Sequence, residues 1–154
     1  MNRVAPIAVV LILLLALVTA FVISETPKPP DLVRDREAIL TAAVQEIVRT
    51  NEDNTKGYRL STYYIAIDDG DPEPVLLRKW SAFVRSSLRP ISQYHGQHGL
   101  VIGLHPRRAE VIGDTVKLGY GFQFGPLHGR CGTFALTRKF GVWNVEYSGA
   151  IYQL

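Results

Sequence analysis

Val116 to Phe124, with the sequence VKLGYGFQF, is the stretch that decides the fold class of this chain. Apolar side chains alternate along it with Lys, Gly or Gln, and they belong to Val116, Leu118, Tyr120, Phe122 and Phe124. A period of two residues is typical of a β-strand with one face in the core and the other toward solvent. Gly119 and Gly121 both fall on the second face, which suits a strongly bent sheet or close packing of a helix.

Two further strands are expected after this stretch. The segments from Arg130 to Lys139 and from Val142 to Gln153 have a similar character and meet at Phe140-Gly141. Gly113-Asp114 marks another tight turn, just before Val116. Strands joined by such short turns pair as an antiparallel meander.

The first half of the chain carries two helical patterns. From about Leu32 to Thr50 apolar residues recur at helical spacing, and Asp31 is placed to cap the first turn. A second helix is expected to begin with Asp71 as its cap and Pro72 in its first turn, and to end at Pro90. Its apolar stripe consists of Leu76, Trp80, Phe83, Val84 and Leu88.

A strand from Tyr58 to Asp68, rich in aromatic and β-branched residues, separates the two helices. The predicted order is therefore helix, strand, helix and then a run of antiparallel strands. This is the α+β pattern, in which two helices pack on one face of a curved antiparallel sheet. Trp143 should then be largely buried against the first helix, because it alternates in register with Val145 and Tyr147.

The amino-terminal end carries an uncharged apolar stretch, Val4 to Ser24, between Arg3 and Glu25. A helix rises about 1.5 Å per residue, so this length matches the ~30 Å hydrocarbon layer of a bilayer. A cleaved secretory signal is the alternative, with Val18-Thr19-Ala20 before the cut. The apolar run continues through Phe21-Val22-Ile23, which favours a retained anchor.

The chain is thus expected to comprise a transmembrane signal-anchor (1–24), a proline-rich linker (25–31) and one folded domain (32–154). Pro27-Lys28-Pro29-Pro30 makes the linker stiff, because proline fixes φ. Arg3 and the amino terminus favour a cytoplasmic start. We expect a single-pass protein of the cell membrane whose carboxy-terminal domain lies outside the cytoplasm.

Composition narrows the classes of partner. Seventeen Lys and Arg against 14 Asp and Glu give a formal charge of +3, and no basic run exceeds two residues. This balance of charges argues against nucleic-acid binding. The expected partner is the membrane, through residues 4–24. Cys131 is the only cysteine, so no intramolecular disulfide can stabilise the domain and a hydrophobic core must do so.

The last hairpin contains Gly141-Val142-Trp143-Asn144-Val145, which is similar to a G-x-W-x-V motif before the final strand of one group of domains. Together with the element order, it resembles the cone-shaped fold of nuclear-transport-factor-2-like (NTF2-like) and cystatin-like domains, over about Leu32 to Leu154. The whole chain also resembles small membrane-anchored bacterial proteins of unknown function. The resemblance implies a fold but no reaction, because that fold hosts both enzymes and binding modules. No acid–base pair of its enzymatic members aligns with residues here.

Three histidines, His95, His98 and His105, lie close together in QYHGQHGLVIGLHP. Imidazole is a common metal ligand, and three of them could hold zinc or copper. Gly96 and Gly99 nevertheless indicate a loop. No helix or strand would then hold the first two histidines in a fixed orientation toward a metal ion. No cysteine or carboxylate lies within the segment to complete a site, and we expect neither a metal nor a cofactor.

Two charged clusters have simpler explanations than a ligand. Asp68, Asp69, Asp71 and Glu73 offer oxygen ligands to calcium, but Pro74 stands where an EF-hand loop requires glycine. A helix cap with an acidic first turn explains this cluster. A second, basic cluster could lie on anionic headgroups or simply form a solvated face, and it comprises Arg78, Lys79, Arg85, Arg89, Arg107 and Arg108.

The candidate ligand-binding residues are aromatic and histidine side chains expected near the mouth of the sheet: Tyr94, His95, His98, His105, Tyr120 and Phe122. No Ser-His-Asp spacing, phosphate-binding loop or nucleotide fingerprint is present. The sequence therefore favours a non-catalytic domain that binds a partner protein or a small ligand. The alternative is an enzyme whose histidine acid–base group or histidine–metal site lies at that mouth, with His95 or His98 beside Tyr94.

Overall fold

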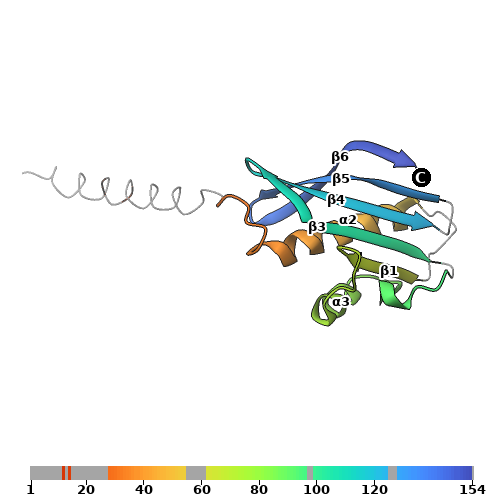
Figure 1. Ribbon diagram of the computed structural model, residues 1–154. Coiled ribbons are helices and arrows are strands. Elements are labelled where there is room, and N and C mark those ends of the chain that lie inside the picture. Colours follow the sequence, from red (N-terminus) through yellow and green to blue (C-terminus); the bar gives the residue numbers. More distant parts are fainter. Residues whose placement is uncertain are drawn as a thin grey trace, which may run out of the picture.

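The computed structural model describes residues 12, 14, 28–54, 62–96, 99–124 and 128–153, apart from the side chains of residues 53, 54, 124, 128 and 149–153. This part of the chain forms an α+β domain, in which a curled six-stranded sheet packs against helix α2 (Arg36–Asn54) (Figure 1). A shorter helix, α3 (Pro74–Ser81), follows strand β1 (Thr62–Ile67) along the chain. The α+β class predicted from the sequence is confirmed.

The strand order of the sheet is β2-β1-β3-β4-β5-β6. Besides β1, the strands are β2 (Ser87–Pro90), β3 (Leu100–Ile112), β4 (Thr115–Phe124), β5 (His128–Lys139) and β6 (Val142–Gln153). Strands β3 to β6 form the expected antiparallel meander. Strand β1, however, is parallel to both β2 and β3, so the prediction of a wholly antiparallel sheet is wrong. The chain leaves β1 through α3, and such a crossover joins parallel strands where a tight hairpin cannot.

Asp31 caps the turn that precedes helix α2, not the helix itself. Asp31 Oδ1 accepts hydrogen bonds from the backbone N–H groups of Val33 at 2.9 Å and Arg34 at 2.8 Å. A hydrogen-bonded turn follows, and the regular helix runs from Arg36 to Asn54 rather than from Leu32 to Thr50. Its predicted apolar face is buried in full: Ile39, Leu40, Ala43, Val44, Ile47 and Val48.

The second helix is much shorter than predicted. It begins at Pro74 with Glu73 as its N-cap, so the expected start at Asp71-Pro72 is wrong. Asp71 instead accepts a hydrogen bond from the backbone N–H of Ser92 at 2.8 Å. Of the residues expected to extend this helix to Pro90, the last four form strand β2. Pro90 is tolerated there because it is the last residue of an edge strand.

The hydrophobic core fills the space between the inner face of the sheet and the two helices. Trp80 of α3 is fully buried, and its Nε1–H donates to Thr41 Oγ1 of α2 at 3.0 Å. Trp143 of β6 is only partly buried, less than the sequence suggested. It lines an open groove of about 400 Å³ between α2 and β6, because no element covers the outer edge of β6 among the described residues.

The predicted anchor, Val4 to Ser24, lies outside the described residues except for Ile12 and Leu14, and it remains a prediction. Within the described part of the chain, no helix combines the length and the apolar character that crossing a bilayer requires. The linker residues from Lys28 to Asp31 meet the domain at one end. The β3–β4 and β5–β6 hairpins turn at that same end (Figure 1).

Candidate functional site

A groove opens where strand β1 ends and strand β3 is interrupted. Its volume is about 470 Å³, and the residues that line it come from the start of α2, the turn after β1, the segment before α3 and the middle of β3. We call it the Asp68 groove. Its polar and rim residues are Val33, Arg36, Asp68, Asp71, Glu73 and Arg107.

The floor of the Asp68 groove is a two-residue turn between Ile67 and Gly70. Ile67 N–H donates to the Gly70 carbonyl at 2.8 Å, and Gly70 N–H donates to the Ile67 carbonyl at 3.0 Å. The central residues, Asp68 and Asp69, have φ values of 48° and 67°. Positive φ at both central positions is typical of a type I′ turn, which favours Asn, Asp and Gly. Both central residues are Asp, which tolerates this conformation, so the local sequence favours the turn.

One wall of the Asp68 groove is an irregularity in β3. Between His105 and Glu110 the pairing with β4 shifts register, so residues 106–109 bulge out of the ladder. Pro106 favours the bulge, because proline has no N–H to donate to a ladder hydrogen bond. Asp68 fixes the position of the bulge: its Oδ1 accepts the Arg107 N–H at 3.1 Å, and its Oδ2 lies 3.6 Å from Arg107 Nε.

The opposite wall joins α2 to the segment before α3. Arg36 Nη1 donates to Glu73 Oε1 at 3.0 Å, across the mouth of the groove. Asp71 Oδ1 accepts the Ser92 N–H, and hydrogen bonds from the side chain and backbone of Ser92 lower the pKa of Asp71 below its usual value. The Asp71 carboxylate therefore stays ionised in neutral solution.

The groove combines hydrogen-bonded carboxylates with apolar side chains. Asp68, Asp71 and Glu73 each accept a hydrogen bond from within the chain. Apolar side chains complete the surface. Ile67 and Pro72 are buried at the floor, and Val33 stands at the rim with 88% of its surface exposed. Polar groups around an apolar centre are the usual composition of a protein-binding surface.

The residues predicted to bind a ligand are divided between the two faces of the sheet. Tyr94 and His95 follow the short 3₁₀ helix η1 (Ile91–Gln93), where the Tyr94 ring centroid lies 5.1 Å from that of Tyr64. Tyr64 points to the outer face of β1, because its neighbours along the strand face the core. His95 is exposed, and His98 lies outside the described residues.

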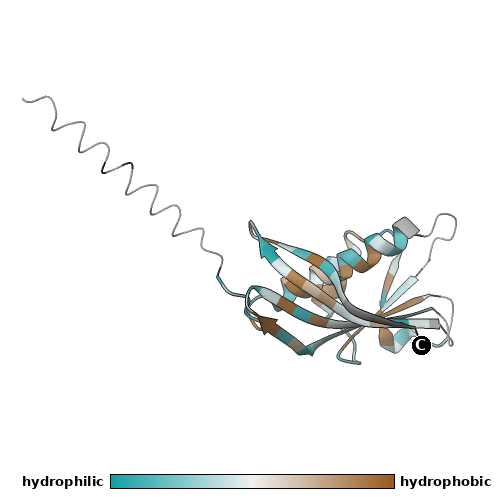
Figure 2. Ribbon diagram, turned by 90° about the horizontal axis from the view of Figure 1, so that it is seen from above, coloured by the Kyte–Doolittle hydropathy of each residue, from teal (hydrophilic) through white to brown (hydrophobic). Residues whose placement is uncertain are grey.

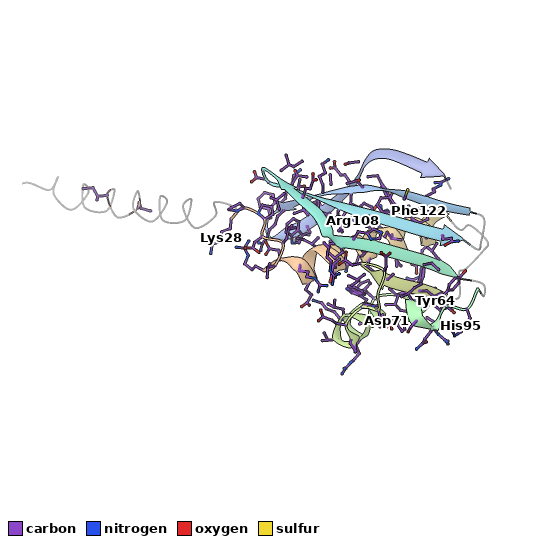
Figure 3. The ribbon with its side chains drawn as sticks, in the orientation of Figure 1. Lys28, Tyr64, Asp71, His95, Arg108 and Phe122 are labelled. Atoms are coloured by element: carbon purple, nitrogen blue, oxygen red, sulfur yellow. The ribbon has the colours of Figure 1, made fainter. Side chains whose placement is uncertain are left out.

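His105 lies on the outer face of β3, with its ring over Gly103 and its Cβ beside Gly119 of the neighbouring strand. Tyr120 and Phe122 lie on the inner face of β4, with ring centroids 5.8 Å apart. Figure 3 shows Phe122 well separated from Tyr64 and His95. The residues that were predicted to bind a ligand, as far as the structure describes them, therefore do not lie together in one site.

Tyr120 belongs to an aromatic cluster that packs as core. Its ring centroid lies 4.2 Å from that of Phe134 and 5.7 Å from that of Tyr147, and only 2% of the residue is exposed. Burial raises the pKa of the Tyr120 hydroxyl above its usual value. Tyr147 closes the cluster at the open edge of the sheet and is 40% exposed.

The members of the basic cluster are all exposed, whereas three members of the acidic cluster, Asp68, Asp71 and Glu73, line the Asp68 groove. Lys79 of the basic cluster forms an ion pair with Glu37 of α2, and Arg107 pairs with Asp68. Arg78, Arg85 and Arg89 are exposed. Among the residues whose positions the structure describes, no three His, Cys, Asp or Glu side chains are placed to hold a metal ion.

Sequence reasoning missed Val33, Arg36 and Arg107 as site residues. Two signals for the site were nevertheless present. Pro106 within an otherwise strand-like pattern indicates a bulge, and Asp68-Asp69-Gly70 indicates a tight turn. Neither signal shows that the two irregularities meet, since their contact depends on the parallel pairing of β1 with β3.

Comparisons with known proteins assign no family to this chain. A scan against protein-family models, a search of curated proteins and a search of solved structures each found no match.

Proposed function

We propose that this chain is a single-pass membrane protein whose folded domain lies outside the cytoplasm and binds a partner protein in the Asp68 groove, without catalysis. The observation that carries the proposal is the exposed apolar side chain of Val33 beside polar groups of fixed position. Asp68, Asp71 and Glu73 each accept a hydrogen bond from within the chain, while Val33 beside them presents an unpaired apolar surface. Such a surface can bury apolar groups of a partner and exchange hydrogen bonds at its rim.

The proposed tether supports a partner at the same membrane. The linker of residues 25–31 can span at most about 25 Å, because an extended chain covers roughly 3.5 Å per residue. Leu32 and Val33 of the groove follow it directly. With Val4 to Ser24 in the bilayer, the groove would therefore stay close to the membrane surface.

We also propose that the domain shares the cone-shaped plan of NTF2-like and cystatin-like domains. The packing of α2 against a curled sheet supports this proposed likeness in fold. It adds no reaction, because function on such a plan is set by the residues of the site.

Site-specific photo-crosslinking tests the binding proposal, with two neighbouring residues as a matched pair. Arg107 lines the Asp68 groove, whereas Arg108 is an exposed neighbour outside it. A photoreactive amino acid replaces one or the other in the full-length chain, and cells are irradiated before membranes are solubilised. We expect a discrete protein adduct from position 107 and none of the same mass from position 108.

The Arg36→Glu substitution provides the specificity control. It places a like charge against Glu73 across the groove and should remove the position-107 adduct while the protein keeps its melting temperature within a few degrees. Equal adducts from both positions, or an adduct that survives Arg36→Glu, would contradict the proposal. A low-molecular-weight adduct at position 107 would instead assign the groove to a small ligand.

A further inference from the structure

Four apolar side chains project from the two hairpins at the linker end of the domain. Phe140 is 100% exposed, Val142 64%, Ile112 58% and Val111 41%. We call these four residues the apolar tip. Figure 2 shows a hydrophobic hairpin end on this side of the domain, close to the linker.

The backbone at Phe140 makes this residue more unusual. Phe140 and Gly141 join β5 to β6, with φ values of 50° and 78°, as in a type I′ turn. A bulky residue is rare at positive φ, where Asn, Asp or Gly is favoured. Phe140 is therefore strained, and with its whole surface exposed it gains no packing within the folded domain. A contact outside the domain would account for its presence.

The apolar tip and the linker occupy the same end of the molecule (Figure 1). Arg138, two residues before Phe140, lies 3.7 Å from Asp35 through its Nη1 and the Asp35 Oδ1. This ion pair joins the β5–β6 hairpin to the start of α2. Val33, itself 88% exposed, lies in the turn just before α2.

Exposed apolar residues are concentrated at this end. From residue 28 onward, the large apolar side chains that the structure describes as exposed are Val33, Val75, Val111, Ile112, Phe140, Val142 and Tyr147. Only Val75 and Tyr147 lie away from the tip and the linker. A random scatter of single apolar residues would need no explanation, but their concentration beside a linker does.

We infer that the apolar tip inserts into the headgroup region of the lipid bilayer and fixes the orientation of the domain on the membrane. The inference rests on the proposed membrane tether, because Val4 to Ser24 in the bilayer would keep the tip within the reach of the linker. Lys139, directly before Phe140, is exposed, and a cation beside an aromatic residue favours contact with anionic headgroups. The side chains project from two separate turns, which suits a soft lipid surface better than a complementary protein pocket.

Fluorescence in vesicles tests this inference with the full-length chain. Cys131→Ser removes the only cysteine, and single cysteines at Phe140 or His95 then carry an environment-sensitive dye. His95 is exposed and lies at the opposite end of the domain (Figure 3). In vesicles of phosphatidylcholine and phosphatidylglycerol we expect a blue shift and at least twofold quenching by headgroup-labelled lipid at position 140, and neither effect at position 95.

The Phe140→Asn substitution provides a variant that should fold at least as well, because Asn tolerates positive φ. We expect it to raise the melting temperature of the solubilised chain and to reduce lipid quenching of a dye at position 112. Equal signals at positions 140 and 95 would overturn the inference. So would a position-112 signal that Phe140→Asn leaves unchanged.

Extraction with alkaline carbonate distinguishes this inference from the proposed tether. Retention of the chain in the vesicles without quenching at position 140 would leave the tether standing and remove the tip contact. Quenching at position 140 in a chain that carbonate removes would keep the tip contact and reject the anchor.

Discussion

Arg138 of strand β5 and Asp35, just before helix α2, form an ion pair with 3.7 Å between Nη1 and Oδ1. Asp35 is almost fully buried, and its carboxylate also accepts hydrogen bonds from Arg34 Nη2 at 2.7 Å and from the Asp31 N–H at 3.0 Å. The carboxylate therefore connects the linker, the first helix and the last hairpin. No sequence pattern indicated the contact between Asp35 and Arg138, because the two residues are about a hundred positions apart in the chain.

Acid should weaken this connection in a defined window. Hydrogen bonding to Arg34, then to the Asp31 backbone, and the charge of Arg138 lower the pKa of Asp35 from 3.8 to about 2. Because the folded-state pKa lies below the unfolded value, the stabilisation is complete above pH 4 and is lost as the pH falls toward 2. Thermal unfolding of the solubilised chain at several pH values should show a steeper loss for the wild type than for Asp35→Asn. Identical slopes would show that Asp35 does not contribute.

Trp80 should contribute more to stability than Trp143. Trp80 is fully buried and donates to Thr41, so Trp80→Ala should lower the free energy of unfolding by about 3–5 kcal/mol. Trp143 is partly exposed beside the α2–β6 groove, and Trp143→Ala should cost only about 1–2 kcal/mol. Urea unfolding followed by circular dichroism measures both. A larger loss for Trp143→Ala would reverse the assignment of the central tryptophan.

Gly132 should not tolerate even a methyl group. A Cβ added there would lie 2.9 Å from the Tyr120 hydroxyl oxygen and 3.1 Å from two of its ring carbons. The Tyr120 ring cannot move away easily, because it stacks on Phe134 and Phe122. Gly132→Ala should therefore lower stability by about 1–3 kcal/mol. Gly119→Ala is the matched control, since its Cβ would meet no atom closer than 3.8 Å. Equal melting temperatures for the two variants would refute the clash.

Zinc should leave the melting temperature unchanged. A metal that binds only the folded state stabilises it, so a real site would reveal itself as an upward shift. His95 is exposed after η1, whereas His105 lies over Gly103 on the outer face of β3. Differential scanning fluorimetry with zinc, copper or a chelator measures the effect. A zinc-dependent shift that disappears in His105→Ala would show that the histidines do converge.

The sequence predicted the parts of the fold that depend on local patterns. The alternation from Val116 to Phe124 predicted β4, and the helical spacing of Leu40, Val44 and Ile47 predicted the buried face of α2. Strand β2 was missed because its four residues, Ser87–Pro90, lie at the end of the predicted helical stripe and carry no alternation long enough to detect. Short strands of this kind form because a neighbouring strand is available, here β1.

The candidate site was harder to predict, because it depends on contacts between residues that are far apart in the sequence. Tyr120 belongs to a strand that the sequence predicted, whereas His105 belongs to β3, whose bounds the sequence did not predict, and no pattern assigned the two residues to opposite faces. The Asp68 groove depends on a bulge at Pro106 meeting a turn at Asp68, and this meeting follows from the register of β1 with β3. Long-range register is set by the whole core, so single-sequence patterns do not reveal it.

The position of β1 within the sheet also has a consequence for synthesis. Both of its neighbours, β2 and β3, follow it in the chain, and α2 packs against β6, the last strand. A chain made from its amino terminus therefore exposes the apolar face of α2 until the strands that cover it have emerged. The β3–β6 meander can form early from local hairpins, whereas α2 and β1 must wait to dock on it. During that interval the nascent amino-terminal half is the part that a chaperone would have to shield.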